Sequence, residues 1–212
     1  MTDLWSGRAD AYRGAADQAE GEDLDLLVSW AAGCVTALDV ATGGGHTARA
    51  LREAGLQVTT LDPAPGMRAD VLARAEDIPF ADASFDVVTC RIAPHHFEDV
   101  HAAVEEMARV AKRLVLIEDT LFTSEDVERA ERLRDPSHVR SYTEEEWRAM
   151  LAAAGLEVEE SVVHRKRRPA ADWLARTETP PDDAAEVLRL LAPYLEDGQY
   201  VDRKLLVKAR TR

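Results

Sequence analysis

An apolar segment that runs directly into three consecutive glycines is the feature that most constrains this chain. Residues 35–40 form the apolar run, Gly43, Gly44 and Gly45 follow, and residues 47–54 have the pattern of a helix. Glycine lets a backbone turn sharply and approach a ligand closely, because it has no Cβ. The amino end of the next helix offers unpaired N–H groups and the positive end of its dipole. This strand–turn–helix unit therefore predicts a cofactor site on an α/β sheet.

A carboxylate follows at the tip of the next predicted strand. Asp62 ends the segment 58–61 and stands 17 residues after Gly45. A carboxylate in that place can accept hydrogen bonds from ribose hydroxyls. Dehydrogenases and methyltransferases share this pair of features, so the pair predicts the fold better than the ligand. A purely structural tight turn, with Asp62 capping the next segment, is the alternative.

The remaining elements alternate in type, which favours a parallel sheet covered by helices. A helix pair and two late strands suggest that an antiparallel edge completes the sheet. The further helices are expected at 24–32, 100–111, 124–134, 147–154 and 182–195, with Trp173 also helical, and the further strands at 70–75 (the weakest), 85–91, 114–117, 156–164 and 200–209. Thr143 and Glu146 form a capping box before the helix at 147–154.

Composition narrows the class of partner. The 212 residues carry a formal net charge of -14, which argues against a nucleic-acid partner because phosphate binding depends on Lys and Arg. No stretch approaches the roughly 20 apolar residues of a membrane span. Cys34 and Cys90 lack metal-ligand spacing, so we expect no metal site and a reducing, cytoplasmic location. We also expect a monomer or a homodimer.

Several motifs resemble those of class I S-adenosylmethionine-dependent methyltransferases. They are the glycine turn, residues 75–80 (AEDIPF) and residues 84–91 (SFDVVTCR). The nearest group is the ubiquinone/menaquinone-biosynthesis-like small-molecule methyltransferases. The resemblance extends from about Gly7 to Ala209 and includes residues 7–12, 91–97 and 135–140.

The resemblance implies an α/β, Rossmann-like seven-stranded sheet with order 3-2-1-4-5-7-6, flanked by helices, in which strand 7 is antiparallel. It also implies S-adenosylmethionine as methyl donor and a small-molecule acceptor, methylated at carbon, oxygen or nitrogen. The domain 1–212 would then comprise an N-terminal helical lid (1–33), a cofactor-binding core (34–119), and a helical insertion with the C-terminal strands (120–212).

Matched residue by residue, the resemblance implies a set of cofactor contacts along the glycine turn, the strand tips and the N-terminal lid. The set is Tyr12, Ala41, Thr42, Gly43, Gly45, Asp62, Pro63, Met67, Ala75, Glu76, Asp77, Arg91 and Ile92. Asp62 would hold the ribose, and Arg91 and Ile92 would flank the sulfur.

The adenine end departs from the family pattern. Arg74 stands where members usually carry an aspartate that accepts the adenine amino proton, and arginine has only donors. Glu76, Asp77 or backbone groups must then read adenine. Pro63, Pro65 and Gly66 also predict that the helix between strands two and three shrinks to a turn.

Histidines supply the candidate catalytic groups. His95 and His96 follow the strand at 85–91, at the carboxyl edge where open α/β sheets bind ligands. Histidine can take the proton that a phenol, enol or amine acceptor loses. His138 and Arg140 are expected to face this pair. Structural packing of one or more histidines is the alternative, and no spacing requires a three-histidine zinc site.

The sequence allows two alternative functions, and one basic run has more than one interpretation. A binding or regulatory protein could keep this fold without catalysis, as Arg74 suggests, whereas a nucleotide-cofactor oxidoreductase is disfavoured because the glycine turn lacks the G-x-x-G spacing. The basic run 164–168 could meet an acidic substrate or RNA, or form a solvated strand end.

Overall fold

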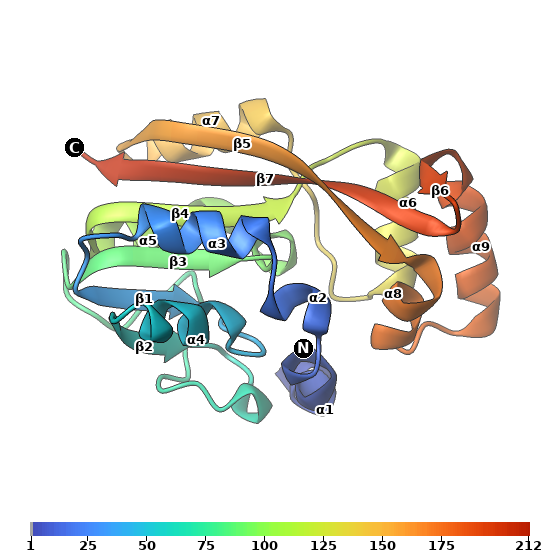
Figure 1. Cartoon of the computed structure of the whole chain (residues 1–212), viewed down its shortest axis with the longest axis horizontal. Helices are drawn as coiled ribbons and strands as arrows, with labels where there is room; N and C mark the ends of the chain where they lie inside the picture. The colour runs from blue at the N-terminus through green and yellow to red at the C-terminus, as the bar shows by residue number, and fades with distance from the viewer. Residues whose placement is uncertain (1) are drawn as a thin grey trace.

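A mixed seven-stranded sheet forms the centre of the protein (Figure 1). The computed structural model describes residues 2–212, so Met1, the first residue of the predicted lid, lies outside the described residues. The strands are β1 (Thr36–Val40), β2 (Gln57–Leu61), β3 (Phe85–Arg91), β4 (Ala111–Thr120), β5 (Leu156–Pro169), β6 (Leu195–Glu196) and β7 (Gln199–Thr211).

The strand order is β2-β1-β3-β4-β7-β5, with β6 paired to β7. The first four strands are parallel, and β7 runs antiparallel between β4 and β5. This confirms the predicted Rossmann-like order, since these strands take the places of predicted strands 2, 1, 4, 5, 7 and 6.

The predicted third strand at 70–75 is reduced to a single bridge. Val71 pairs in parallel with Leu61, so this backbone keeps its expected place beside β2. The Asp70 carboxylate accepts hydrogen bonds from the Thr60 N–H and hydroxyl, which ends the pairing. As predicted, no long helix precedes this bridge, and a short 3₁₀ turn at Pro65–Met67 replaces it.

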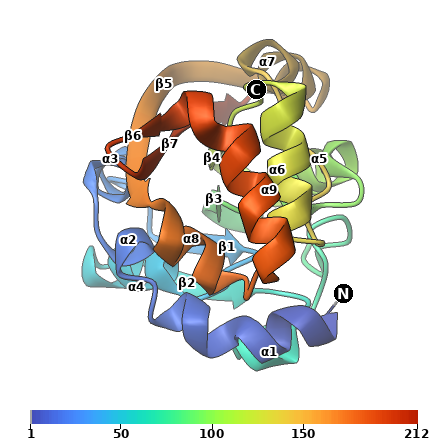
Figure 2. The ribbon, with the colours of Figure 1, turned by 90° about the vertical axis from the view of Figure 1, so that its right-hand side faces the viewer.

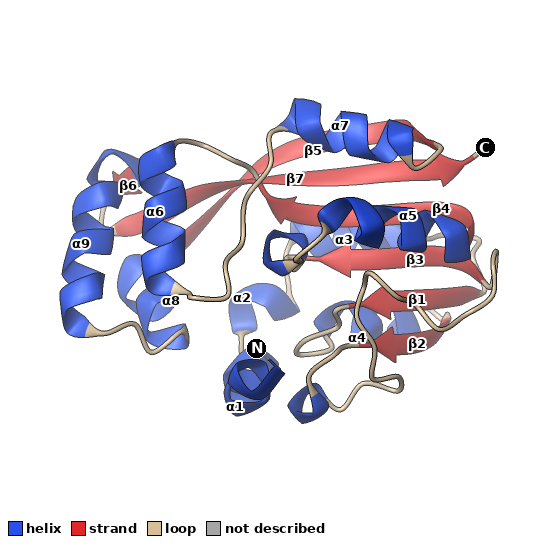
Figure 3. Cartoon of the chain, turned by 180° about the vertical axis from the view of Figure 1, so that it is seen from behind, coloured by secondary structure: helices blue, strands red, loops and turns tan. Residues whose placement is uncertain are grey.

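Helices cover both faces of the sheet. One face carries α3 (Glu22–Trp30) and α4 (His46–Glu53), which lie in front in Figure 1. The other carries α5 (Val100–Val110) and α7 (Glu144–Ala153), which lie in front in Figure 3. The predicted capping box at Thr143 and Glu146 is present at the start of α7. Each face has its own cluster of buried apolar side chains, which fixes the sheet between the layers.

A lobe extends beyond the carboxyl ends of β3 and β4. The 14-residue β5 and the 13-residue β7 run out past the parallel strands, farther than the sequence predicted. The helices α6 (Glu125–Arg134), α8 (Ala170–Arg176) and α9 (Pro181–Leu191) pack around this extension (Figure 2). The predicted helix at 182–195 ends earlier, because a 3₁₀ turn containing Pro193 follows Leu191.

Two N-terminal helices lie beside the same carboxyl edge of the sheet. They are α1 (Thr2–Arg13) and α2 (Ala16–Ala19), seen below the lobe in Figure 1. The edge is therefore enclosed by the N-terminal helices and the C-terminal lobe. Among residues 2–212, no helix combines the length and the apolar character needed to cross a membrane.

Candidate functional site

The glycine turn leaves the end of β1 in left-handed backbone conformations. Ala41, Gly43 and Gly45 have φ values of 53°, 52° and 76°. Glycine adopts this region without the steric cost that a side chain brings. A Cβ on Gly44 would lie 2.5 Å from the Tyr12 carbonyl oxygen, so glycine there admits the end of α1. The turn is thus shaped by its own backbone and by the N-terminal helix.

The Asp39 side chain stabilises the glycine turn through hydrogen bonds. Its carboxylate accepts hydrogen bonds from the hydroxyls of Thr42 (2.6 Å) and Thr89 (2.9 Å) and from the N–H of Ala48 in α4. The side chain is buried, and this burial raises its pKa from 3.8 to about 6. Asp39 therefore ties β1, β3 and the start of α4 together next to the glycine turn.

We expect Asp39→Asn to change how stability depends on pH. Because burial raises the pKa of Asp39 to about 6, its stabilising effect is full below pH 3.8 and is lost as pH rises through 6. At about 1.4 kcal/mol for each pH unit, this loss is about 3 kcal/mol. Asparagine resembles the neutral acid and does not ionise, so the variant should gain about 3 kcal/mol on the wild type between pH 4 and pH 7. Urea unfolding at both values measures this, and parallel stability curves would refute it.

Asp62 links the turn to the tip of β2. Its Oδ2 accepts the N–H of Gly43 at 3.0 Å and its Oδ1 accepts the N–H of Ala64 at 2.9 Å. The side chain is buried, and burial raises its pKa. A carboxylate oxygen has more than one acceptor position, so each oxygen can still accept a hydroxyl hydrogen.

A cavity of about 150 Å³, called here the glycine-turn cavity, opens beside these groups. Eleven of the predicted cofactor residues line it: Tyr12, Ala41, Thr42, Gly43, Asp62, Pro63, Met67, Ala75, Glu76, Arg91 and Ile92. Gly45 and Asp77 do not line it. The lining also includes Trp5, Gln18, Gly44, Arg74, Ala93, His96, Phe97 and Glu98. Trp5 and Gln18 reach the cavity from the N-terminal segment, where no sequence motif marked them.

The helix α1 rests directly on the glycine-turn cavity. The Arg13 guanidinium donates to the Gly66 carbonyl at 3.0 Å, and the Gly66 N–H donates to the Ser6 hydroxyl at 3.1 Å. His46 at the start of α4 bonds through Nε2 to the Tyr12 carbonyl at 2.9 Å. Polar contacts from both sides of the cavity thus hold α1 over it.

A second, smaller cavity of about 40 Å³ adjoins the first and is called here the histidine cavity. The two share Tyr12, Gln18, Ile92 and His96. The rest of its lining comes from β4, the lobe and the segments around them: His95, Thr120, Glu131, Arg134, His138, Arg168, Trp173, Arg176, Asp202 and Lys204. Ile92 has a φ of 55°, a costly conformation for a β-branched residue, at the junction of the two cavities.

The three predicted histidines come together at the histidine cavity. The ring centroid of His95 lies 4.0 Å from that of His96 and 5.4 Å from that of His138. His95 Nδ1 lies 2.5 Å from Asp119 Oδ1, and His138 Nε2 lies 3.1 Å from Glu128 Oε2. Burial lowers the pKa of both His95 and His96 well below 6.5, so both are neutral at pH 7.

Sequence reasoning missed Asp119. It lies on β4, is fully buried, and burial raises its pKa from 3.8 to about 7. An acid at the tip of a strand that neighbours the histidine segment is the signal that could have found it. Arg140, by contrast, lines neither cavity. Its guanidinium pairs with Glu146 and lies 4.9 Å from the ring centroid of Tyr142, on the outside of the protein.

Comparisons with known proteins agree with this geometry. A methyltransferase-domain family matches residues 38–117. The uncharacterized methyltransferase YcgJ of Bacillus subtilis (strain 168) is 36% identical, over 87% of this chain and 82% of that protein. The chain belongs to the class I S-adenosylmethionine-dependent methyltransferase family.

Other relatives of this methyltransferase support the same assignment. The solved structure of BH2331 from Bacillus halodurans C-125 superposes with a TM-score of 0.79 at 31% identity, over 90% of this chain and 99% of that one. A demethylmenaquinone methyltransferase of Renibacterium salmoninarum is 39% identical over 35% of this chain and 36% of that protein. The resemblance to quinone-biosynthesis methyltransferases is thus present, over a shorter stretch.

Arg74, the departure from the family pattern, forms ion pairs at the rim of the methyltransferase's glycine-turn cavity. Its guanidinium lies 3.1 Å from Glu76 Oε1 and 3.2 Å from Glu98 Oε2. The same Glu76 oxygen accepts the backbone N–H of Glu98 at 3.1 Å. Oε1 of Glu76 also accepts the backbone N–H of Asp99 at 3.4 Å, so three donors already share this oxygen, and Arg74 helps to hold the loop together.

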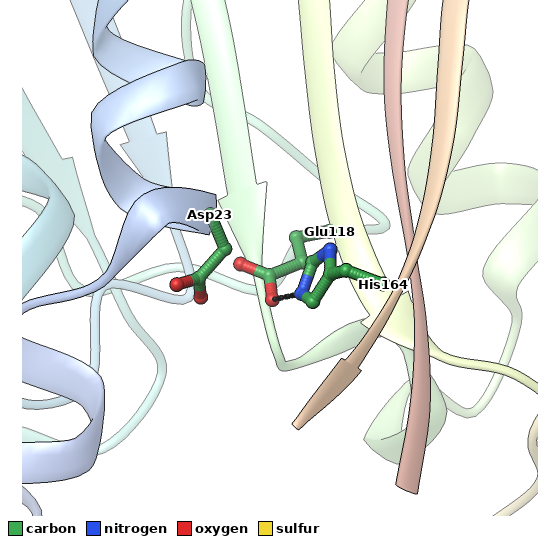
Figure 4. Close-up of side chains that lie close together, drawn as sticks. All are labelled: Asp23, Glu118 and His164. Atoms are coloured by element: carbon green, nitrogen blue, oxygen red, sulfur yellow. Dashed lines mark ion pairs between the residues drawn. The ribbon is translucent and has the colours of Figure 1, made fainter. Parts of the chain in front are cut away.

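A buried ion cluster lies behind Arg91. The guanidinium bonds to Asp23 and Glu118, each at 2.5 Å. Figure 4 shows Asp23 and Glu118 facing each other from α3 and β4, with His164 beside Glu118 at 3.3 Å. Ligand atoms of these three residues lie within 4.8 Å of one another, but Arg91 and Lys166 already balance the two carboxylates.

Ion pairs account for the position of the basic run 164–168. In β5 these residues alternate between the two sides of the strand, and each lies beside an acid: His164 near Glu118, Lys166 near Asp23, Arg168 near Asp202, and Arg165 and Arg167 near Glu196. The run is thus tied into the methyltransferase's own ion pairs.

Proposed function

We propose that the protein transfers a methyl group from S-adenosylmethionine to a small-molecule acceptor, with the cofactor held in the glycine-turn cavity. The Asp62 carboxylate is the observation that carries this proposal. It lines the cavity, is fixed by two backbone N–H groups, and keeps acceptor capacity for the ribose hydroxyls. Family membership and the strand–turn–helix unit support the same cofactor.

The lining fits the two ends of such a cofactor. Ala41, Gly43 and Gly44 present a backbone free of bulky side chains to the methionine end. Met67 and Ala75 supply an apolar surface for adenine. Since Glu76 Oε1 is shared with Arg74 and the Glu98 N–H, we propose that backbone groups contribute to reading the adenine edge.

When bound, S-adenosylmethionine supplies a methyl group whose bond to sulfur breaks as it bonds to the acceptor, while the acceptor's proton leaves to a base. We assign His95 as that base, with His96 and His138 beside it. Its Nδ1 is held by Asp119, which leaves Nε2 to take the proton. Burial lowers the pKa of His95, so the ring is neutral and ready to accept at pH 7.

The rest of the chain has matching roles in this proposal. Residues 1–33 form a lid, 34–119 hold the cofactor, and 120–212 complete the acceptor side. A closed lid excludes water from the reacting atoms. The net charge of -14 argues against a nucleic-acid partner, and the two cysteines without metal-ligand spacing fit a metal-free cytoplasmic enzyme.

Calorimetric titration with S-adenosylhomocysteine tests the proposal. We expect binding to the wild type, and Asp62→Ala should weaken it about 10- to 100-fold, because hydrogen bonds to a charged group contribute about 1.5–3 kcal/mol. Asp70→Ala is the matched control, since Asp70 also bonds to backbone and hydroxyl beside β2 but does not line the cavity. No heat with the wild type at millimolar ligand, or equal affinity in the two variants, would reject the assignment.

A further inference from the structure

His95 and His96 are each held through one ring nitrogen and leave the other open at the histidine cavity. His95 Nδ1 lies 2.5 Å from Asp119 Oδ1, and His96 Nδ1 lies 3.1 Å from the Ser137 carbonyl oxygen. Among residues 2–212, no protein group bonds to Nε2 of either ring, and neither Nε2 is fully buried. In the third ring, by contrast, Nε2 is paired and Nδ1 is fully buried. Nε2 of His95 and Nε2 of His96 are therefore the histidine nitrogens that a ligand in this cavity can reach.

The partners of the two Nδ1 atoms determine where the ring hydrogens lie. A carbonyl oxygen only accepts, so His96 Nδ1 must carry the hydrogen that it donates to Ser137. The Ser137 hydroxyl donates to Asp135 at 2.6 Å, so its oxygen can accept from the same Nδ1, which lies 3.2 Å away. Burial raises the pKa of Asp119 to about 7, so at pH 8 this carboxylate is mostly ionised and accepts from His95 Nδ1. Burial also lowers the pKa of both rings well below 6.5, so each ring carries only one hydrogen on nitrogen.

Two hydrogen-bond acceptors thus lie side by side at the cavity surface. A neutral ring with its hydrogen on Nδ1 has a lone pair at Nε2. The ring centroids of His95 and His96 lie 4.0 Å apart, which is close enough for one ligand atom to donate to both rings. A hydroxyl has one hydrogen and would leave one Nε2 unpaired, at a cost in affinity, whereas a primary amine has two hydrogens. His96 also lines the glycine-turn cavity, so a nitrogen held in this way lies where the two cavities meet.

The size of the histidine cavity limits the ligand. One water needs about 10–15 Å³ measured in this way, so about 40 Å³ accommodates roughly three non-hydrogen atoms. An amine nitrogen and about two further atoms fill this space. An aromatic ring exceeds it, so the part of the acceptor that enters the cavity is small and unbranched.

We infer that the methyl acceptor is a small primary amine whose two N–H groups are held by Nε2 of His95 and Nε2 of His96, so that methylation takes place on nitrogen. The inference rests on the proposed function, since it takes the neighbouring cavity as the cofactor site. With both hydrogens held, the nitrogen lone pair is left to face the methyl donor. As this lone pair bonds to the methyl carbon, the carbon–sulfur bond breaks and its electrons stay on sulfur. The nitrogen then releases one hydrogen as a proton to His95 Nε2.

Nitrogen NMR on histidine-labelled protein tests the positions of the ring hydrogens without any ligand. The two neutral forms of imidazole have different nitrogen shifts at Nδ1 and Nε2, and each ring is assigned through its backbone resonances. We expect both His95 and His96 to carry their hydrogen on Nδ1 at pH 8. A hydrogen on Nε2 of either ring would overturn the inference.

Matched small probes test the choice of nitrogen over oxygen on the protein saturated with S-adenosylhomocysteine. Methoxyamine and ethanol have the same number of non-hydrogen atoms and are both uncharged at pH 8, but methoxyamine ends in an NH₂ group and ethanol in a hydroxyl. We expect methoxyamine to bind at tens of millimolar or below, and at least 10-fold more tightly than ethanol, as measured by calorimetry. Equal binding of the two probes, or no binding of methoxyamine in this range, contradicts the inference.

The variant His96→Phe connects the binding to the cavity. Phenylalanine keeps a ring beside Trp5, whose ring centroid lies 4.6 Å from that of His96, but it removes both nitrogens. It should weaken methoxyamine binding at least 10-fold, whereas the matched control His101→Phe, on the exposed face of α5, should not change it. Equal methoxyamine binding in the two variants would remove His96 from the site. The probe comparison uses the wild type, so it decides the question even if His96→Phe does not fold.

The outcomes separate the two proposals. Absence of S-adenosylhomocysteine binding in the wild type would refute the cofactor assignment, and the NMR measurement would still test the amine site. Retained S-adenosylhomocysteine binding, together with equal binding of methoxyamine and ethanol, would refute only the amine site.

Discussion

Arg91→Met is expected to lower the free energy of unfolding by about 3–5 kcal/mol, because it leaves two buried carboxylates without their shared cation. Arg91 is 4% exposed, and its guanidinium bonds to Asp23 and Glu118 at 2.5 Å each. Lys166 remains 3.2 Å from Asp23, and His164 remains 3.3 Å from Glu118. Urea unfolding at pH 7 measures the loss.

Arg140→Met is the matched control for this prediction. Arg140 also forms an ion pair, with Glu146, but its side chain is 52% exposed. Exposed pairs contribute about 0–1 kcal/mol, so the control should change stability by no more than that. Equal effects of the two substitutions would contradict the view that the Arg91 cluster is a buried structural joint.

The loss of stability caused by Arg91→Met should also depend on pH. The Arg91 cation lowers the pKa of Asp23, so this carboxylate stabilises the fold above its ordinary value of 3.8 and loses that effect as pH falls. The stability gap between wild type and Arg91→Met should therefore narrow on acidification. A gap that stays constant from pH 5 to pH 2 would mean that packing alone explains the loss.

The residues around the glycine-turn cavity could be found from the sequence because the elements that carry them are local. The turn at Gly43–Gly45 follows β1 directly, and Asp62 ends the next strand, so strand periodicity and a short motif placed both at one sheet edge. The histidine segment was found for the same reason, since η2 (Pro94–His96) follows the tip of β3. Short connections between neighbouring parallel strands make such positions predictable.

The lining of the histidine cavity could not be predicted in full, because distant segments build it. Lys204 and Thr120 are 84 residues apart and meet only through the register of β4 and β7. Arg168 reaches the cavity because β5 continues five residues beyond its expected end at His164, and no local pattern predicted this extension. The basic run 164–168 resembled a solvated strand end in the sequence. Its pairing with β7 shows that its side chains alternate between the two sides of β5, which directs Lys166 and Arg168 toward buried acids.

The departure at Arg74 shows a second limit. Arginine at a position that usually accepts a hydrogen bond left open which groups would read adenine. Glu98, 24 residues later, gives Arg74 a partner that sequence spacing did not reveal. Ion pairs at the cavity rim thus hold the Arg74 side chain in place.

His95→Gln should lower the rate of methyl transfer about 10²- to 10⁴-fold, the usual contribution of a positioned general base. His95 lines the histidine cavity, and its Nδ1 is fixed by Asp119 at 2.5 Å. Glutamine keeps a polar side chain but cannot take the acceptor's proton. The rate is followed as labelled methyl transferred from S-adenosylmethionine to a metabolite extract.

Two further measurements separate catalysis by His95 from structural support. Binding of S-adenosylhomocysteine should stay within about 3-fold in His95→Gln, and His101→Gln, on the exposed face of α5, should leave the rate unchanged. Burial lowers the pKa of His95, and a base works only when unprotonated, so the rate of the wild type should stay level as pH falls to 6.5 and decline only below it. A decline that begins well above pH 6.5, with His95→Gln still active, would assign proton removal to another group.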